Sequence, residues 1–374
     1  MSLASPETPA RPTRVLHVVG SMNRGGVETW LMNVLRNVSR DELAFDFMVH
    51  RPDAAAYDEE LLALGAGRYV CKWPNNPLIY ARNFLKILRE HGPYDVVHSH
   101  VHHFSGFVLL LAKLAGVPIR IAHGHSDTSA AQQKASGPRL AYLKGTEELI
   151  DYAATAGIAV SEKAAISLFG EDWQNDQRWK IIYCGIDFKP FEVEVDRNEV
   201  REELGIAEGA FVIGHVGRFD EAKNHNFLID VFQRVKLSKN NSVLLLIGDG
   251  KLKDIIQNKV FSLNLQNDVI FLGVRDDISK LMKGIMDVFV FPSKHEGLGL
   301  SLVEAQAAGL RCIASESISQ EAKISNNCKF LPLSAELDIW TNDILECDSS
   351  NSVLISNRFD MSINIEMLKM CYEI

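Results

Sequence analysis

Two glutamates stand eight positions apart in a glycine-rich segment that follows an apolar run ending at Phe291. Glu304 falls about one turn into a predicted helix, where its carboxylate could reach a ribose hydroxyl, and Glu296 precedes that helix in the loop, where it could hold sugar hydroxyls. The alternative is a surface glutamate and a helix-capping glutamate around an ordinary turn, because Glu is common in the first turn of helices. The pair alone does not decide between the two interpretations.

The loop around Glu296 has the composition of a phosphate site. Gly297 and Gly299 let the backbone come close to a ligand, because a residue without a Cβ tolerates geometries that others avoid. Residues 300–308 read as a helix whose first amides point back at the loop, and such a terminus attracts anions. The segment therefore predicts a phosphate group bound at the start of this helix.

A second motif supplies positive charge. Gly217 and Arg218 follow the apolar run 211–216, and Lys223 and Asn224 come a few residues later. An arginine offers a planar fork and a lysine a point charge, so the two could neutralise the charge that builds on a departing diphosphate. Each cation alone is more often a solvated surface charge, but the two motifs together favour a diphosphate site.

Six of the twelve histidines fall in one stretch, which predicts a shared role: His98, His100, His102, His103, His123 and His125. No cysteine or carboxylate accompanies them at metal-ligand spacing, so we predict no metal and expect the imidazoles to line a cleft. The chain also contains no Asp-x-Asp motif. Arg218 and Lys223 would then replace a divalent cation, and no cofactor is expected.

The elements that position these residues alternate between strands and helices. Apolar runs at 15–19, 45–49, 95–98, 119–122 and 157–160 alternate with helical stretches such as 27–38, 83–91 and 107–115, and the pattern restarts at 211 with further strands at 243–247, 269–272, 288–291 and 312–314. This alternation predicts two α/β domains, each with a doubly wound parallel sheet. Ligands of such sheets bind beyond the carboxyl ends of the strands, where both charged motifs fall.

Length and composition set limits on the class of protein. With 374 residues the chain is long enough for two domains, and 47% hydrophobic and 23% charged residues are typical of a globular protein. A net charge of -9 opposes nucleic acid as a partner. The six cysteines are scattered along the sequence, which is typical of reduced thiols and favours a cytoplasmic location. The apolar run 107–112 is too short to span a bilayer, so we expect any membrane contact to be peripheral.

These motifs resemble the retaining, nucleotide-sugar-dependent glycosyltransferases of the GT-B fold, family four, nearly end to end. The resemblance rests on the pair Arg218 and Lys223, the Gly-Asp-Gly turn at 248–250, and the two glutamates Glu296 and Glu304. It implies that Arg218 and Lys223 hold the donor diphosphate, that Glu296 binds the transferred sugar and that Glu304 binds the ribose. The donor would be a nucleotide diphosphate sugar, UDP-linked by expectation, and no metal would be required.

The resemblance also implies further contacts. A histidine after the strand 119–122 would face the donor sugar; either His123 or His125 can be aligned with it, with His125 slightly preferred, and His100 and Glu28 are further cleft candidates. The remaining donor-binding residues implied are Gly25, Gly26, Gly217, Arg275, Gly297, Leu298, Gly299 and Leu300.

The C-terminal end departs from most of the family and is similar to a subgroup linked to capsule and exopolysaccharide assembly. The donor loop after Ala314 lacks the usual glycine, a helix contains Trp340, and the chain closes on a segment from Phe359 to Tyr372. The predicted organisation is a flexible tail (1–13), an N-terminal acceptor-side Rossmann-like domain (14–187), a C-terminal nucleotide-sugar-binding Rossmann-like domain (188–355) and a helix (356–374) that returns to the N-terminal domain, with a cleft between the domains.

The function implied is transfer of a hexose or N-acetylhexosamine to a hydroxyl of a saccharide or lipid-linked glycan, in the cytoplasm or at the inner face of the membrane. A sugar-nucleotide epimerase of the same fold is one alternative, but such enzymes lack the two paired motifs. A non-catalytic nucleotide-sugar-binding protein of an assembly complex is the other, and the presence of all four charged residues argues against it.

Overall fold

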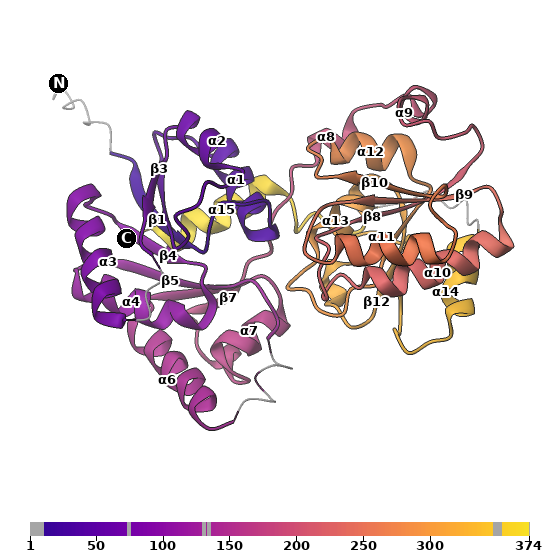
Figure 1. Cartoon of the computed structure of the whole chain (residues 1–374). Helices are drawn as coiled ribbons and strands as arrows, with labels where there is room; N and C mark the ends of the chain where they lie inside the picture. The colour runs from indigo at the N-terminus through magenta and orange to yellow at the C-terminus, as the bar shows by residue number, and fades with distance from the viewer. Residues whose placement is uncertain (1–10, 73–75, 129–131, 133–135, 347–353, 374) are drawn as a thin grey trace, which may run out of the picture. The chain divides into compact units, whose positions relative to one another are not determined.

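The computed structural model describes residues 11–72, 76–128, 132, 136–346 and 354–373. The chain divides into two compact units, and Figure 1 shows a sheet with helices on both faces in each. Unit 1 comprises Met1–Tyr183 and Met361–Ile374, and unit 2 comprises Cys184–Asp360. Each unit is described by itself below.

Unit 1 is built on seven parallel strands in the order β3-β2-β1-β4-β5-β6-β7. Its strands are β1 (Thr13–Val19), β2 (Leu43–Val49), β3 (Gly67–Val70), β4 (Val96–Ser99), β5 (Ile119–Gly124), β6 (Ala156–Ala159) and β7 (Trp179–Ile181). Its α-helices are α1 (Gly26–Asn37), α2 (Asp58–Ala63), α3 (Pro77–His91), α4 (Ser105–Leu114), α6 (Pro138–Ala153), α7 (Glu162–Phe169) and α15 (Met361–Tyr372), and two short 3₁₀ helices span His102–Phe104 and Trp173–Asn175.

The period of two along β1 divides the side chains of unit 1 between the two faces of the sheet. Leu16 and Val18 are fully buried in the core beneath α3, α4 and α6, together with residues such as Phe84 and Val108. His17 points to the opposite face, where its ring lies beside those of Phe45 and Phe47. A polar residue in an apolar strand is thus directed away from the main core.

Unit 2 repeats this architecture with six parallel strands in the order β10-β9-β8-β11-β12-β13. Its strands are β8 (Phe211–Val216), β9 (Ser242–Ile247), β10 (Val269–Gly273), β11 (Val288–Phe291), β12 (Arg311–Ser315) and β13 (Cys328–Leu331). Its α-helices are α8 (Lys189–Glu192), α9 (Arg197–Glu203), α10 (His225–Ser238), α11 (Lys253–Ser262), α12 (Ile278–Ile285), α13 (Leu300–Ala307) and α14 (Leu337–Leu345), and a 3₁₀ helix spans Gln320–Ala322. Its core joins sheet residues such as Leu244 and Val290 to Phe232 of α10 and Trp340 of α14.

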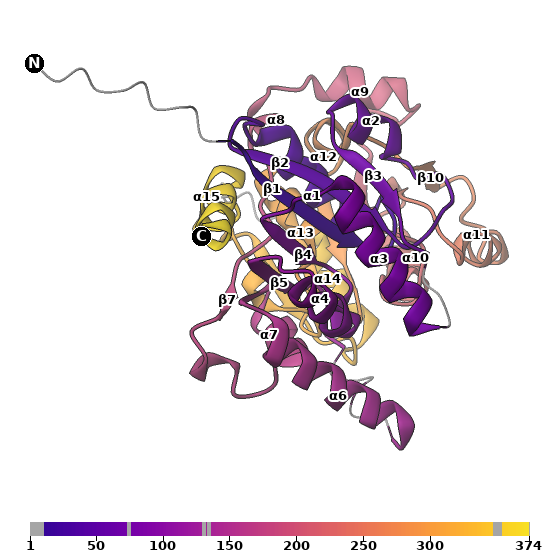
Figure 2. The same cartoon turned by 90° about the vertical axis from the view of Figure 1, so that its left-hand side faces the viewer.

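The closing helix α15 belongs to unit 1 although it ends the chain, and Figures 1 and 2 show it in yellow beside the strands of that unit. Trp30 of α1 donates its indole N–H to the side-chain oxygen of Asn364 at 2.9 Å, and Asn364 donates in turn to the carbonyl oxygen of Tyr183. Both side chains are about 1% exposed. The last helix is therefore held by buried hydrogen bonds to the start and the end of the first 183 residues.

The prediction of two doubly wound Rossmann-like domains is confirmed, and all ten predicted strands are present. Three further strands were not predicted: β3, β7 and β13. Each lies at an edge of its sheet, where pairing on one side only relaxes the need for a continuous apolar run.

The predicted tail over residues 1–13 is wrong at its end. Thr13 opens β1, and Arg11 forms a bidentate ion pair with Asp95, with distances of 2.7 and 2.6 Å. Residues 1–10 lie outside the described part of the chain. Five cysteines are buried free thiols, and Cys347 lies outside the described residues. No helix in the described ranges is both long and apolar enough to cross a membrane.

Candidate functional site

Both charged motifs of unit 2 follow the two strands that flank the reversal of strand order. The order runs outward from β8 in one direction and from β11 in the other, and a doubly wound sheet binds its ligand at such a point, beyond the carboxyl ends. Gly217 and Arg218 directly follow β8, and the glutamate loop directly follows β11. The topology therefore brings together two segments that are about 75 residues apart in the sequence.

Backbone and side-chain contacts join the two loops. The amide of Lys294 donates to the carbonyl oxygen of Ala222 at 2.7 Å, and the side chain of Asn224 donates to the carbonyl oxygen of Pro292 at 3.2 Å. Asn224 has φ +57° and ψ +40°, the left-handed geometry that asparagine tolerates. This conformation begins α10 directly after Lys223.

The central pair of the site is Lys223 and Glu296. Lys223 Nζ lies 2.7 Å from Glu296 Oε1, and the side chains are 17% and 14% exposed. The same ammonium lies 4.6 Å from the centre of the Phe291 ring, within the range of a cation–π contact. Arg218 is exposed and pairs with no carboxylate of the described residues, so its guanidinium is available to an anion.

Glycines allow these loops to pack closely. A Cβ on Gly217 would lie 3.0 Å from the Lys223 stem, and a Cβ on Gly248 would lie 2.1 Å from the carbonyl oxygen of Gly217. The amide of Phe219 also donates to the carbonyl oxygen of Asp249 at 3.0 Å. The Gly-Asp-Gly turn at 248–250 therefore packs directly against the Arg218 loop. A side chain on Gly248 would prevent this contact.

Helix α13 places the second glutamate. Its N-cap Gly299 has φ +90° and offers no side-chain cap, so the first amides of the helix remain open to a ligand. The carboxylate of Glu304 makes no hydrogen bond to another described residue, and burial raises the pKa of this carboxyl to about 7, with Lys223 opposing the shift. Such a carboxyl is poised to exchange a proton near neutral pH.

The remaining predicted donor residues differ in their surroundings. Gly297 and Leu300 are half-buried and Leu298 is 4% exposed in the loop that leads into α13. Arg275, which follows β10, forms a bidentate ion pair with Asp277 at 2.8 and 2.6 Å. Its guanidinium is therefore already partnered within its own loop.

In unit 1, the predicted glycine loop forms the start of α1. Gly25 is the N-cap without a side-chain hydrogen bond, and a Cβ on Gly26 would meet nothing within 4 Å. Glu28 is half-buried in the first turn of the same helix. The open space at Gly26 leaves room beside the free amides of the helix start.

Five histidines of unit 1 form two hydrogen-bonded chains. In one chain, His17 Nδ1 lies 3.0 Å from His100 Nε2, and His100 Nδ1 lies 2.8 Å from His125 Nε2. In the other, the Tyr372 hydroxyl lies 2.7 Å from His98 Nδ1, and His98 Nε2 lies 3.0 Å from His123 Nδ1. Burial lowers the pKa of His17 and of His125 to about 3, and it lowers those of His98, His100 and His123 well below 6.5.

The structure distinguishes the two histidines that the sequence could not. His123 is fully buried beneath the edge of Trp30, at a centroid distance of 5.2 Å, whereas His125 is half-buried. His100 is also half-buried. His125 and His100 therefore have surface exposed to solvent, whereas His123 lies wholly inside the unit.

Four buried histidines were not predicted from the sequence: His17, His50, His215 and His225. His17 joins the cluster because it is the register partner of His98 across β1 and β4, a relationship that only strand pairing reveals. In unit 2, His215 donates its Nδ1–H to the carbonyl oxygen of Val290 at 2.8 Å, and the ring of His225 stacks on that of Phe219 at a centroid distance of 4.0 Å. Burial, then Lys223, lowers the pKa of His225 to about 4, so this ring next to the lysine is neutral.

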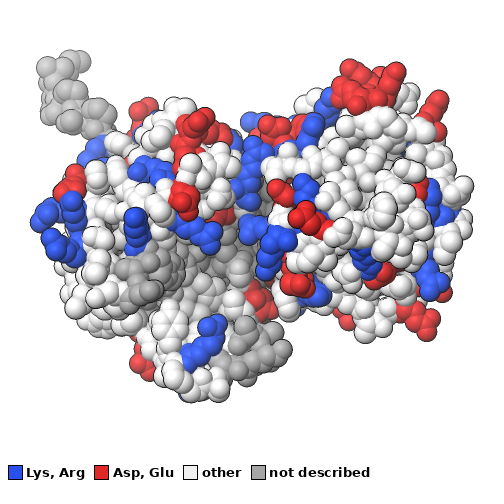
Figure 3. All heavy atoms as spheres, viewed as in Figure 1, with Lys and Arg blue, Asp and Glu red and all other residues white. Residues whose placement is uncertain are grey.

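The charged surface offers no basic face on the side shown in Figure 3, where Lys and Arg are intermixed with Asp and Glu on each unit. This agrees with the net charge of -9. The cations that we expect to bind an anionic ligand are therefore Arg218 and Lys223, in the loop that follows β8.

Comparisons with known proteins agree with the fold of the two units. A family model described as "Glycosyltransferase Family 4" matches residues 24–189, and one described as "Glycosyl transferases group 1" matches residues 196–331. The chain is 40% identical over 335 residues to the putative glycosyltransferase EpsF of Bacillus subtilis (strain 168), covering 88% of this chain and 86% of the relative.

Further relatives and solved structures extend the comparison. The capsular polysaccharide biosynthesis glycosyltransferase CapH of Staphylococcus aureus is 26% identical and covers 96% of this chain and 98% of its own length. The UDP-Gal:alpha-D-GlcNAc-diphosphoundecaprenol alpha-1,3-galactosyltransferase of Escherichia coli is 29% identical, covering 76% of this chain and 71% of the relative. The crystal structure of HepE of Anabaena with UDP and glucose shares the fold, with a TM-score of 0.79, 22% identity and coverage of 96% and 99%. The chain thus belongs to the GT-B glycosyltransferases of the family-four type.

Proposed function

We propose that this glycosyltransferase moves a hexose or N-acetylhexosamine from a UDP-linked sugar to a hydroxyl of a saccharide or lipid-linked glycan, with retention, in cell-surface polysaccharide synthesis. The observation that carries the proposal is the Lys223–Glu296 pair at 2.7 Å beside the open start of α13. One residue of the pair suits a phosphate and the other suits sugar hydroxyls. Their contact supports a donor bound with the bond between phosphate and sugar at this point.

Lys223 and Arg218 neutralise the diphosphate as it leaves. Preorganised charges of this kind are usually the largest contribution to catalysis when negative charge develops on a leaving group. Lys223 is anchored by Glu296 and by the Phe291 ring, whereas Arg218 is exposed and unpaired among the described residues. The cationic role of a metal at the diphosphate is thereby supplied by the protein, and we propose that the donor site needs no metal.

The two glutamates recognise the ends of the donor. Glu304 accepts hydrogen bonds from the ribose hydroxyls. These hydrogen bonds favour the ionised carboxylate, although the pKa of Glu304 in the protein without ligand is about 7. Glu296 accepts from hydroxyls of the transferred sugar.

The acceptor hydroxyl attacks from the face that the diphosphate leaves, and a phosphate oxygen of the donor takes its proton. Support for a UDP donor and a lipid-linked acceptor comes from the relative whose name states both and from the HepE complex with UDP and glucose. A lipid-linked acceptor would place the reaction on the cytoplasmic side of a membrane, with peripheral contact.

A panel of nucleotide sugars and nucleoside diphosphates, tested with and without EDTA, examines the proposal. We expect UDP and at least one UDP-sugar to raise the melting temperature, because a ligand that binds only the folded state stabilises it, and we expect slow donor hydrolysis that EDTA does not abolish. No shift with any nucleotide would contradict the proposal. Binding without hydrolysis or transfer would indicate the non-catalytic alternative, and an epimerised donor would indicate an epimerase.

A further inference from the structure

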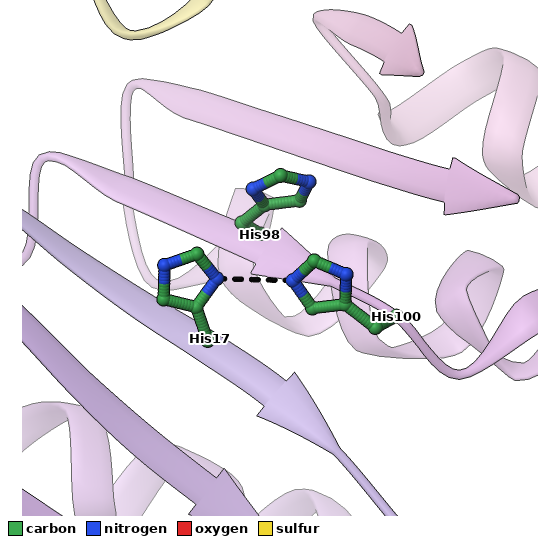
Figure 4. Close-up of side chains that lie close together, drawn as sticks. All are labelled: His17, His98 and His100. Carbon is green, nitrogen blue, oxygen red and sulfur yellow. Dashed lines mark hydrogen bonds between the residues drawn. The ribbon is translucent and has the colours of Figure 1, made fainter. Parts of the chain in front are cut away.

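Five imidazoles gather at the reversal of strand order in unit 1, where β1 pairs with β4 and β4 pairs in turn with β5. His17 and His98 are register partners on adjacent strands, so their side chains lie on the same face of the sheet. His100, His123 and His125 extend the group to the carboxyl ends of β4 and β5. Figure 4 shows His17 and His100 directed at each other, with His98 next to them.

Hydrogen bonds between the rings do not satisfy the whole cluster. His17 Nε2 and His123 Nε2 have no hydrogen-bond partner among the described residues. Water cannot replace a partner at the surface, because the two residues are only 1% and 0% exposed. A buried nitrogen without a partner is destabilising, because it has lost its hydrogen bonds to water. The cluster therefore has an unfilled requirement for a ligand at His123.

One set of three rings can converge on an ion. Single nitrogens of His100, His123 and His125 all lie within 4.8 Å of one another. His100 Nδ1 and His125 Nε2 are 2.8 Å apart, and the unpartnered nitrogen of His123 is the third candidate atom. The other possible set includes His98, whose two nitrogens already contact Tyr372 and His123, so the first set is favoured.

We propose that His100, His123 and His125 bind a divalent transition-metal ion such as Zn²⁺, with His17 and His98 as supporting hydrogen-bond partners. Three imidazoles are a sufficient protein ligand set for zinc, with water at the fourth position. The sequence alone predicts no metal at these histidines, because no cysteine or carboxylate accompanies them at metal-ligand spacing.

The second nitrogen of two of the three ligands has a partner, as metal-bound imidazoles usually do. Coordination through His123 Nε2 leaves the proton on Nδ1, which donates to His98 Nε2, and His98 then donates through Nδ1 to the Tyr372 oxygen. Coordination through His100 Nδ1 leaves Nε2 to donate to His17 Nδ1. Each of these three hydrogen bonds then has one donor and one acceptor.

The surroundings are compatible with binding. Two ligands at about 2.0 Å in tetrahedral geometry lie about 3.3 Å apart, so the His100 and His125 nitrogens must separate by about half an ångström. The rings of His123 and His125 stack at a centroid distance of 3.8 Å, so one of them must also turn for both to face the ion, and the His125 ring is half-buried rather than enclosed.

Metal content of the full-length protein tests the proposal. The chain is equilibrated with Zn²⁺ or Co²⁺ and dialysed, and bound metal is quantified together with the visible absorption of tetrahedral Co²⁺. We expect one ion per chain, quenching by Co²⁺ of the fluorescence of Trp30, whose ring lies 5.2–6.1 Å from the three ligand rings, and at least about tenfold weaker binding in His100→Asn and His125→Asn. The matched control is His103→Asn, a half-buried histidine outside the cluster, which should bind as the wild type does.

Absence of stoichiometric Zn²⁺ and Co²⁺ from the wild-type protein would overturn the proposal, and so would equal binding by the wild type and both ligand variants. Circular dichroism reports whether each variant is folded, and the wild-type result decides the proposal if a variant does not fold. UDP binding to the residues of unit 2 is measured in parallel. A failure of the metal site would leave that binding intact, whereas a failure of the proposed function would abolish it.

Discussion

Lys223 Nζ lies 2.7 Å from Glu296 Oε1, although the two residues belong to loops that follow different strands of unit 2. The contact exists because β8 and β11 are adjacent and parallel, so the loops at their carboxyl ends meet. An ammonium held in this way is oriented before a ligand arrives. Catalysis by preorganised charge depends on such orientation.

Replacing Lys223 by alanine should reduce kcat by about 10²–10³, because the cation that stabilises the departing diphosphate is lost. The melting temperature should fall as well, because Glu296 would keep its largely buried position without its cation. Lys294→Ala is the matched control: this lysine lies in the same loop region, is 44% exposed and pairs loosely with Glu221 at 3.7 Å. Steady-state rates of sugar transfer check the prediction, and a Lys223→Ala rate equal to wild type would exclude the lysine from the mechanism.

Glu304→Gln should stabilise the ligand-free protein at pH 8 more than at pH 5. The pKa of Glu304 is raised to about 7 from an ordinary 4.5, so between these values the folded state binds more protons than the unfolded state, and the wild type loses stability as the pH rises. The variant has no carboxyl at this position to titrate. The difference in free energy of unfolding between the variant and the wild type should therefore increase by about 2 kcal/mol from pH 5 to pH 8. Urea unfolding at both pH values measures it; a gap that is constant with pH would show that the carboxyl is not perturbed.

Gly248→Ala should weaken UDP binding and destabilise the protein by more than about 2 kcal/mol, because the new methyl would meet the Gly217 carbonyl oxygen at 2.1 Å. Gly209→Ala is the control for backbone geometry alone. Gly209 also has a positive φ, +76°, but a Cβ there would meet nothing within 4 Å, so only about 1 kcal/mol is expected. Equal losses in the two variants, measured by denaturant unfolding and UDP titration, would rule out the supporting role of the turn.

Asn364→Ala should destabilise unit 1 by about 2 kcal/mol, because the Trp30 indole N–H and the Tyr183 carbonyl would lose their buried partner. Met370→Ala on the same helix is the control, since this side chain is 60% exposed. Chemical denaturation followed by tryptophan fluorescence compares them. An Asn364→Ala protein as stable as the control would show that these hydrogen bonds do not secure α15.

The sequence predicted the central strands of both sheets because buried parallel strands require continuous apolar runs, as in 243–247. It did not predict Gly67–Val70 or Cys328–Leu331, since these edge strands are only partly buried and depend on a neighbour for pairing. Their positions follow from the order of the sheet, which local patterns do not encode.

The donor motifs of unit 2 were predictable because charged and glycine residues follow strands directly, so that strand position fixes their edge. The histidine cluster was only half predictable. His17 lies within the apolar run 15–19 and gives no local sign that it meets His98 and His100. The choice between His123 and His125 likewise depends on burial, which the alternation of His, Gly and His did not determine.

Sugar transfer itself is the most direct measurement. The wild-type protein and Lys223→Ala are each incubated with UDP-sugars and a pool of lipid-linked saccharide acceptors. Mass spectrometry then gives the masses and amounts of the products that each protein forms. The account predicts an acceptor that gains the mass of one hexose or N-acetylhexosamine with the wild type, with at least about a hundredfold less product from the variant. Transfer that proceeds equally in Lys223→Ala, or no acceptor that gains a sugar from any UDP-linked donor, would contradict it.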